Sequence, residues 1–213
     1  RERHDGLLPV PGDGGFNWSG FLPVAELPQA VNPKDGWLAT ANHNIIPEGY
    51  QRQIGYEFAP PYRFQRIRDV LGSREQWELA DFRTLQHDDH SLAGLKLVRL
   101  LGKIELPESL AGHRKRLQAW DGGLRSSETN GPDVGPLYAI WLRELQEEFL
   151  GLHFSKDQRK NFGGLVGLPA IIHAFETADR TWFGENNVEM RDRVLLRSLE
   201  KAADAYELLP KTK

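Results

Sequence analysis

The pattern of apolar residues changes near residue 62, and this change constrains the fold more than any other feature of the chain. Most of the 13 prolines precede it. The short segments 37–41 and 54–58 are typical of strands between turns, whereas later apolar residues recur at helical spacing. The sequence therefore predicts an irregular segment with a little sheet over residues 1–62 and a helical region over residues 63–213.

The helical region contains several amphipathic patterns. Phe64, Ile67 and Leu71 share one helical face, and Gly72 offers a C-terminal stop. The tetrapeptide Ser73–Gln76 matches a capping box and is expected to begin the next helix. Further apolar stripes predict inward-facing helices over Leu110–Trp120, Val134–Phe149, Ile171–Ala178 and Met190–Tyr206. We expect roughly six or seven helices without a fixed repeat, hence no solenoid.

Two polar, turn-rich stretches, residues 125–133 and 151–164, are expected to be surface loops. The boundary near residue 62 lacks the Gly/Ser or Pro-rich composition of a flexible tether, so the two parts are expected to touch. The fold class predicted from these features is α+β, with α-helices predominant.

Charge and composition exclude several classes of function. The net charge is −3, so the chain has no field that would gather phosphates, and nucleic acid is not an expected partner. The longest apolar runs are far shorter than the roughly 20 residues of a bilayer crossing, so no membrane partner is expected. Cysteine is absent, which excludes disulfides, thiol catalysis and Cys-ligated zinc.

The sequence His87–His90 has the residue types of a metal site. Adjacent residues on a helix point about 100° apart, so only His87 and His90 could share a face. A single pair of ligands is an incomplete site. We therefore interpret the cluster as structural and expect no metal in this chain.

The segment Trp37–Asn44, W-L-A-T-A-N-H-N, runs from apolar residues directly into two asparagines. Asparagines often end strands, start turns and tolerate the left-handed region, so Asn42 and Asn44 need no function. A carboxamide held at a strand end is also a good hydrogen-bond donor for an oxyanion. On these residues alone both interpretations remain open.

Three earlier runs precede that segment, L-L-P-V-P-G at Leu7–Gly12, N-W-S-G-F-L-P at Asn17–Pro23 and N-P-K-D-G-W at Asn32–Trp37. Their order and spacing resemble the penicillin acylase (penicillin amidase) family of N-terminal nucleophile hydrolases. Weaker matches follow at Gln86–Asp88, where Asp88 is expected as a helix N-cap or buried structural acceptor, and in the W-D-G of Trp120–Gly122. The W-D-G turn is expected to have a packing role.

The resemblance implies that this chain is an internal segment of the larger (β) subunit of a four-layered αββα enzyme. In this family one precursor cuts itself, and the freed N-terminal serine of the larger subunit is the nucleophile. Position 1 of this chain is Arg, so the nucleophile is expected elsewhere. The chain alone is therefore expected to be inactive.

The resemblance also implies the site residues. Asn42 matches the asparagine whose side-chain amide contributes to the oxyanion hole, and Arg63 matches an arginine that gives electrostatic support near the reacting centre. The carboxylate that binds calcium in the family would fall near Arg52 or Gln53, and neither is acidic. No cofactor is expected in this chain, although the intact enzyme could bind calcium.

The intact parent is expected to hydrolyse the linear amide of N-acyl substrates, such as β-lactam side chains or N-acyl homoserine lactones. Its expected partners are the small-molecule substrate, the small subunit and the rest of the large subunit. Its expected location is the periplasm or the medium. The main alternative is a non-catalytic helical interaction or scaffold domain, in which Asn42 and Arg63 lie far apart; a metal-dependent hydrolase is a third candidate.

Overall fold

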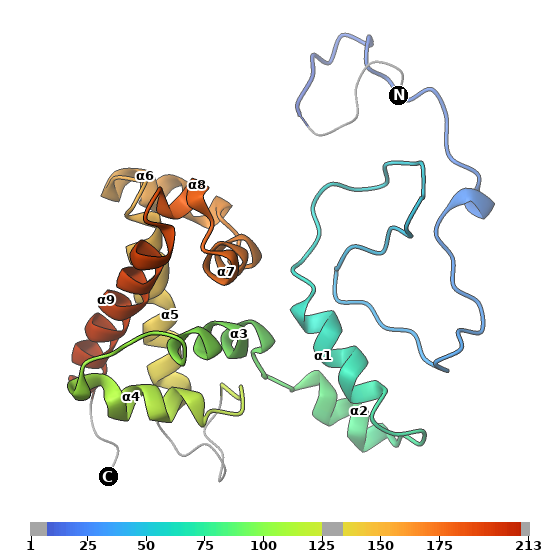
Figure 1. The fold of residues 1–213 in the computed structure, drawn as a ribbon. Helices are drawn as coiled ribbons and strands as arrows, with labels where there is room; N and C mark the ends of the chain where they lie inside the picture. The colour runs from blue at the N-terminus through green and yellow to red at the C-terminus, as the bar shows by residue number, and fades with distance from the viewer. Residues whose placement is uncertain (1–7, 125–133, 210–213) are drawn as a thin grey trace. The chain divides into compact units, whose positions relative to one another are not determined.

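The computed structural model describes residues 8–124 and 134–209. These residues form nine α-helices and two short 3-10 helices, and the chain divides after Gln76 into two compact units. The helices are η1 (Val24–Glu26), α1 (Tyr62–Leu71), α2 (Leu79–Gln86), α3 (Leu92–Leu101), α4 (Glu108–Gln118), α5 (Val134–Leu150), α6 (Lys156–Phe162), η2 (Gly163–Leu165), α7 (Leu168–Thr177), α8 (Arg180–Phe183) and α9 (Asn187–Glu207). Figure 1 shows their arrangement within each unit.

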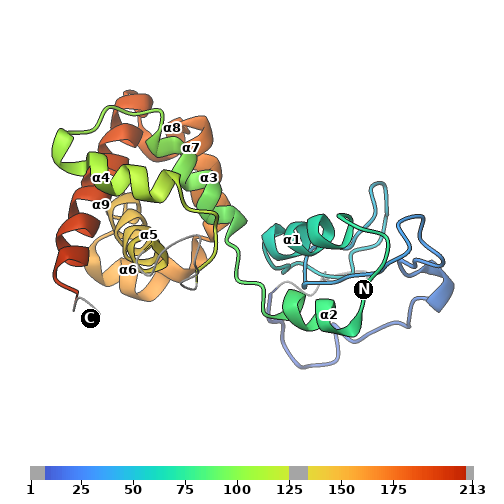
Figure 2. The same cartoon turned by 90° about the horizontal axis from the view of Figure 1, so that it is seen from below.

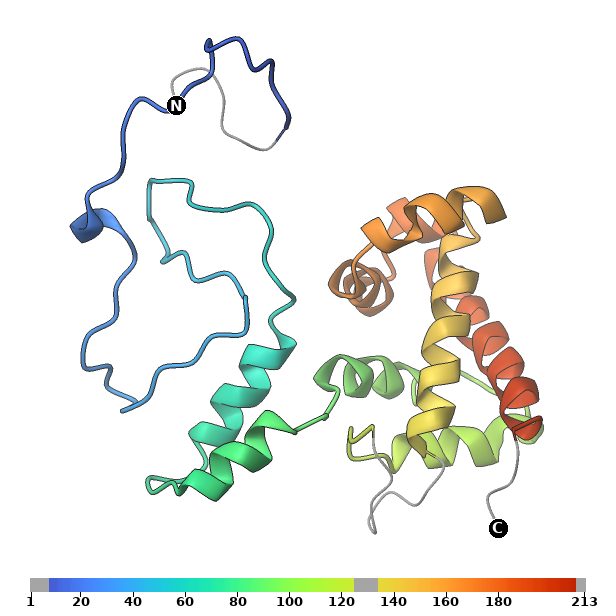
Figure 3. The same ribbon diagram turned by 180° about the vertical axis from the view of Figure 1, so that it is seen from behind.

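In the described residues of the first unit, a long irregular segment that contains η1 leads into α1, as Figure 3 shows. Among its described residues only Ala41 and Leu71 are buried hydrophobics. Trp18, Phe21 and Val31 are instead 71%, 99% and 79% exposed. The described part of this unit therefore has almost no apolar core of its own.

The β part of the predicted α+β class is not supported. Residues 37–41 and 54–58 are irregular, and the described residues contain no strand. A strand is stabilised by a ladder of backbone hydrogen bonds to a neighbouring strand. Next to residues 37–41 and 54–58 there is instead a single backbone hydrogen bond, from Ala59 N to Asn42 O at 2.7 Å. The helical prediction is confirmed. Tyr62 begins α1 where the sequence pattern changes, and the proposed division of domains at this residue stays a prediction.

The second unit is organised around α5 and α9, which lie side by side and antiparallel (Figure 1). Figure 2 looks nearly along α5, with α4 and α9 beside it. Trp141 of α5 and Leu199 of α9 are fully buried, and the Trp141 indole N–H donates to Ser198 Oγ at 3.1 Å. The apolar stripe predicted over Val134–Phe149 is confirmed. None of the described helices has both the length and the apolar composition needed to cross a bilayer.

The W-D-G turn after α4 has the packing role expected of it. Trp120 is buried and stacks on Tyr138 of α5 with ring centroids 4.4 Å apart. Its indole N–H donates to Gly123 O at 2.6 Å, and Gly122 O accepts from Ser91 N at 2.8 Å. The turn therefore joins the end of α4 to the start of α3.

Two predicted segments differ in the structure. Ser73 does not begin a helix, because its hydroxyl donates back to Val70 O at 2.7 Å and α2 starts only at Leu79. Residues 151–164 are only partly a loop, since they contain α6. The other predicted loop, residues 125–133, lies outside the described residues.

Candidate functional site

Asn42 and Arg63 are in direct contact in the first unit. Arg63 lies in the first turn of α1, and its Nη2 donates to Asn42 Oδ1 at 3.2 Å and to Ala41 O at 2.8 Å. The two residues are 21 positions apart in sequence. The structure thus brings together the two residues that the sequence selected, and their catalytic roles stay predictions.

The backbone around Asn42 suits this contact. Asn42 has φ 59°, in the left-handed region that asparagine tolerates better than most residues. Its own carbonyl accepts a bond from Ala59 N at 2.7 Å, just before the Pro60-Pro61 pair that leads into α1. The loop is therefore tied to the start of α1 through both its backbone and its side chain.

The contact with Arg63 fixes which way the Asn42 carboxamide faces. A guanidinium can only donate, so the carbonyl oxygen faces Arg63 and the Nδ2 hydrogens face away from it. No partner for Nδ2 is recorded within the described residues. A hydrogen bond from a cation to the oxygen also polarises the amide, which strengthens the N–H groups as donors. Asn42 is exposed and so presents these donors at the surface.

A second pair of residues adjoins the first and was not predicted from the sequence. His43 follows Asn42, Phe64 follows Arg63, and their rings stack with centroids 3.6 Å apart and planes 13° apart. No sequence pattern specifies this contact. In the sequence, His43 and Phe64 are distinguished only by their positions directly after Asn42 and Arg63.

Asn44 has the turn role that its residue type allows. Its Oδ1 accepts a bond from Ile46 N at 2.9 Å, which is an Asx turn. The two asparagines therefore differ: the side chain of Asn44 is used locally, and that of Asn42 binds Arg63.

The His87–His90 cluster lines an open pocket of about 510 Å³ together with Arg83 and Thr84. His90 lies 3.5 Å from an oxygen of Asp88 and 4.0 Å from one of Asp121. Among the described residues no three acidic or histidine side chains are placed to hold a metal ion.

Asp88 is a structural acceptor, as expected, but its side chain is 14% exposed and not buried. Asp88 Oδ1 accepts a bond from His90 N at 3.1 Å, which is a structural role. The N-cap of α3 is instead Ser91, whose Oγ accepts from Gly94 N at 3.0 Å.

The residues at the family's calcium position do not fit that ion. Arg52 Nη2 lies 2.8 Å from Glu26 Oε2, and Tyr50 donates to the carbonyl of Glu26 at 2.7 Å. A guanidinium repels a divalent cation and occupies the carboxylate that could have bound it. The pair instead ties η1 to residues 50–52.

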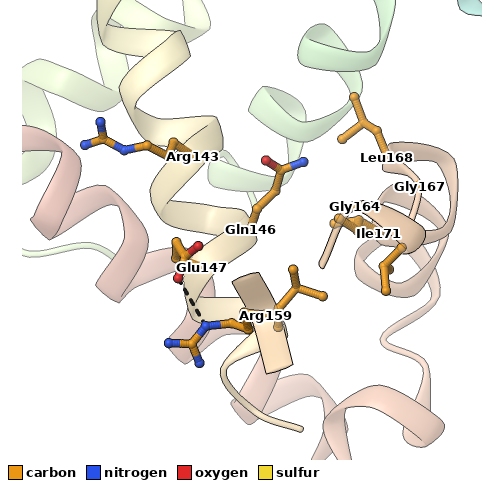
Figure 4. A pocket seen from close by; sticks show the side chains of 10 residues that line it. Arg143, Gln146, Glu147, Arg159, Gly164, Gly167, Leu168 and Ile171 are labelled. Atoms are coloured by element: carbon orange, nitrogen blue, oxygen red, sulfur yellow. Dashed lines mark ion pairs between the residues drawn. The ribbon is translucent and has the colours of Figure 1, made fainter. Parts of the chain in front are cut away.

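A further pocket of about 400 Å³ lies beside α5 and the start of α7. Figure 4 shows Leu168 and Ile171 on one side and the ion pair of Arg159 with Glu147 on the other, at 3.1 Å. Arg143 extends away from these apolar side chains and pairs with Glu144 at 2.8 Å. The two arginines are thus neutralised by neighbouring carboxylates, unlike Arg63, whose recorded partners are neutral oxygens.

The model of the penicillin amidase family matches residues 1–211. The chain belongs to the penicillin amidase family. Within that family, "Acyl-homoserine lactone acylase QuiP" of Pseudomonas fluorescens Pf-5 is 34% identical over 98% of this chain and 28% of the relative. The protein of the same name from Pseudomonas aeruginosa is 30% identical, over 68% of this chain and 18% of the relative.

"Penicillin acylase 2 proenzyme" of Pseudomonas sp. SE83 is 30% identical over 57% of this chain and 16% of the relative. The chain therefore spans less than a third of the length of these relatives. The family resemblance inferred from the motifs is confirmed, and the names of the relatives are those of amide hydrolases.

Proposed function

We propose that this chain is an internal segment of the larger subunit of an N-terminal serine amidohydrolase, to which it contributes the oxyanion-hole donor Asn42. The observation that carries the proposal is the bond from Arg63 to Asn42 Oδ1, which leaves the amide N–H groups facing outward. The scaffold interpretation makes no use of this contact. Membership of the penicillin amidase family supports the reaction class.

In the proposed mechanism a terminal serine, from a part of the enzyme outside this chain, attacks the carbonyl carbon of the substrate amide. The carbonyl oxygen becomes negative, and Asn42 Nδ2 donates a hydrogen bond to it. Because the charge is greatest in the tetrahedral intermediate, a fixed donor stabilises the transition state more than the substrate. The terminal amine takes the serine proton and passes it to the amide nitrogen, so that the C–N bond breaks and a neutral amine leaves. Water then attacks the acyl-enzyme and releases the acid, and the serine regains its proton.

Arg63 has two roles in this scheme. Its guanidinium fixes the Asn42 carboxamide before substrate arrives, so that little reorganisation is needed during the reaction. Its positive charge also favours the oxyanion and a neutral terminal amine, which can then act as the base. The two bonds from Arg63 Nη2 hold the guanidinium in place, and because both acceptors are neutral oxygens they do not cancel its positive charge.

The proposed partners are the small subunit and the rest of the large subunit. The apolar side chains of Trp18, Phe21 and Val31 are exposed in this chain, and contact with those parts would remove them from water. The proposed substrates are N-acyl homoserine lactones and N-acylated β-lactams, which the names of the relatives suggest. From the family we also propose export to the periplasm or the medium.

The proposal is tested with the full-length precursor that contains this chain, using a panel of N-acyl homoserine lactones and phenylacetylated β-lactams. Release of free amine is expected for at least one substrate. Asn42→Ala is expected to lower kcat by roughly 10²- to 10³-fold, the usual effect of removing an oxyanion-hole donor. Asn44→Ala is the matched control and is expected to retain activity, because its side chain serves a local turn.

Two results would contradict the proposal. One is an Asn42→Ala enzyme with the wild-type kcat. The other is amine release by the purified 213 residues alone, since the proposed nucleophile is outside them.

A further inference from the structure

Two consecutive residues of the loop meet two consecutive residues of α1. Arg63 binds Asn42, and the next residue in each segment forms the stacked pair of His43 and Phe64. The rings are nearly parallel and their centroids are 3.6 Å apart, which is close contact over a whole ring face. This contact restrains the residue directly after the proposed oxyanion donor.

Within the described residues, His43 interacts through the face of its ring, which stacks on Phe64. Its Nδ1 is buried and has no hydrogen-bond partner among the described residues. A buried polar atom without a partner destabilises a fold, so hydrogen bonding through Nδ1 does not account for this side chain. What the imidazole supplies here is a flat surface that covers Phe64.

We propose that His43 is a positioning residue for Asn42, acting through its stack on Phe64. The stack holds residue 43 against α1, so that Asn42 keeps its left-handed backbone and its side chain stays within reach of Arg63. This inference rests on the proposed function. A displacement of about 1 Å in such a donor is enough to lower a rate by roughly a hundredfold.

The experiment measures kcat and KM in the full-length enzyme for His43→Ala, His43→Phe, Phe64→Ala and the double variant His43→Ala/Phe64→Ala. His43→Ala is expected to lower kcat by about tenfold to a hundredfold. KM is expected to stay within about twofold, because the loss is of an interaction made in the transition state. His43→Phe keeps the flat ring and is expected to retain kcat.

The double variant tests whether the two rings act together. If they do, it is no slower than the slower single variant. His153→Ala is the matched control, because His153 also lies against an aromatic ring, that of Trp182 at 5.4 Å, in the second unit. That variant is expected to retain kcat.

The inference is overturned if His43→Ala keeps kcat, or if His43→Phe is as slow as His43→Ala, since the second result would assign the role to a ring nitrogen and not to the flat ring face. If His43→Ala does not fold, His43→Phe and the non-aromatic His43→Gln decide the same question. A slow Asn42→Ala enzyme with an unaffected His43→Ala enzyme refutes only the positioning role. An unaffected Asn42→Ala enzyme refutes the proposed function itself.

Discussion

Gly94 in α3 offers a test of the packing between α3, α4 and α5. A Cβ placed at this glycine would lie 2.6 Å from Tyr138 Cζ and 2.8 Å from Trp120 Cζ3. Neither ring has room to move. They are 3% and 4% exposed, they stack on each other, and each has a hydrogen bond, from Trp120 Nε1 to Gly123 O at 2.6 Å and between Tyr138 OH and Ser91 Oγ at 3.4 Å.

Two effects of Gly94→Ala oppose each other. Alanine in place of glycine within a helix stabilises a protein by up to about 1 kcal/mol. Forcing an extra methyl group into a packed core destabilises it by about 1 to 3 kcal/mol. Because both contacts are below 3.0 Å, the clash outweighs the gain. Subtracting a helical gain of about 1 kcal/mol from a clash in the upper part of its range, about 2 to 3 kcal/mol, leaves a net loss of about 1 to 2 kcal/mol. For a chain of this length that loss lowers Tm by about 2 to 8 °C.

The measurement is thermal and urea denaturation of the protein, followed by tryptophan fluorescence. Gly112→Ala in α4 is the matched control, because a Cβ there meets nothing within 4 Å. That variant is expected to be more stable than wild type, by up to about 1 kcal/mol. A Gly94→Ala protein as stable as the Gly112→Ala protein would refute the packing described for α3.

Three further predictions follow from buried or bound groups. Ser198→Ala leaves the buried Trp141 N–H without its acceptor and is expected to lower the free energy of unfolding by about 1 to 3 kcal/mol in urea denaturation; an unchanged midpoint would contradict this. Burial raises the pKa of Tyr138 above 10.0, partly opposed by its bond to Ser91. Its contribution to stability is therefore complete below pH 10 and is lost as the pH rises through the raised pKa, so unfolding midpoints at alkaline pH should fall less in Tyr138→Phe than in wild type. Arg63→Met is expected to lower kcat of the full-length enzyme by about tenfold to a hundredfold, since the carboxamide loses its anchor, and a wild-type kcat would count against that role.

The same four-residue pattern, S-x-x-Q, occurs at Ser73–Gln76 and at Ser155–Gln158, and a helix begins within it only at the second position. Ser73–Gln76 was expected to begin a helix, but the hydroxyl of Ser73 binds back to the end of α1. Ser155–Gln158 lies in residues 151–164, which the sequence predicts to be a surface loop. There Gln158 Oε1 accepts from Ser155 N at 2.9 Å and α6 follows. A capping box is a local preference, and the competing acceptor at Val70 decided the first case.

The prediction of strands was wrong for a different reason. Strand preference in residues 37–41 and 54–58 describes side chains that fit a half-buried, pleated surface. Such a preference becomes a strand only when a neighbouring strand pairs with it, and the described residues provide none. Helices need no distant partner for their backbone bonds, which is why the stripe of α5 was predicted correctly.

The candidate site was predicted only in part. The order and spacing of the motifs identified Asn42 and Arg63, but not the hydrogen bond that joins them. The structure adds the bond from Nη2 to Asn42 Oδ1, the second bond to Ala41 O and the adjacent stack of His43 on Phe64. These contacts depend on where the chain returns after 21 residues, which no local pattern specifies.

The most direct test of the oxyanion role compares two inhibitors of the full-length enzyme. An alkylboronic acid would form a tetrahedral adduct with the proposed terminal serine and place an oxygen where the oxyanion develops, whereas the product carboxylic acid forms no such adduct. We expect Asn42→Ala to weaken binding of the boronic acid by roughly a hundredfold or more and binding of the carboxylic acid by less than about threefold. Equal weakening of both, or of neither, would contradict it.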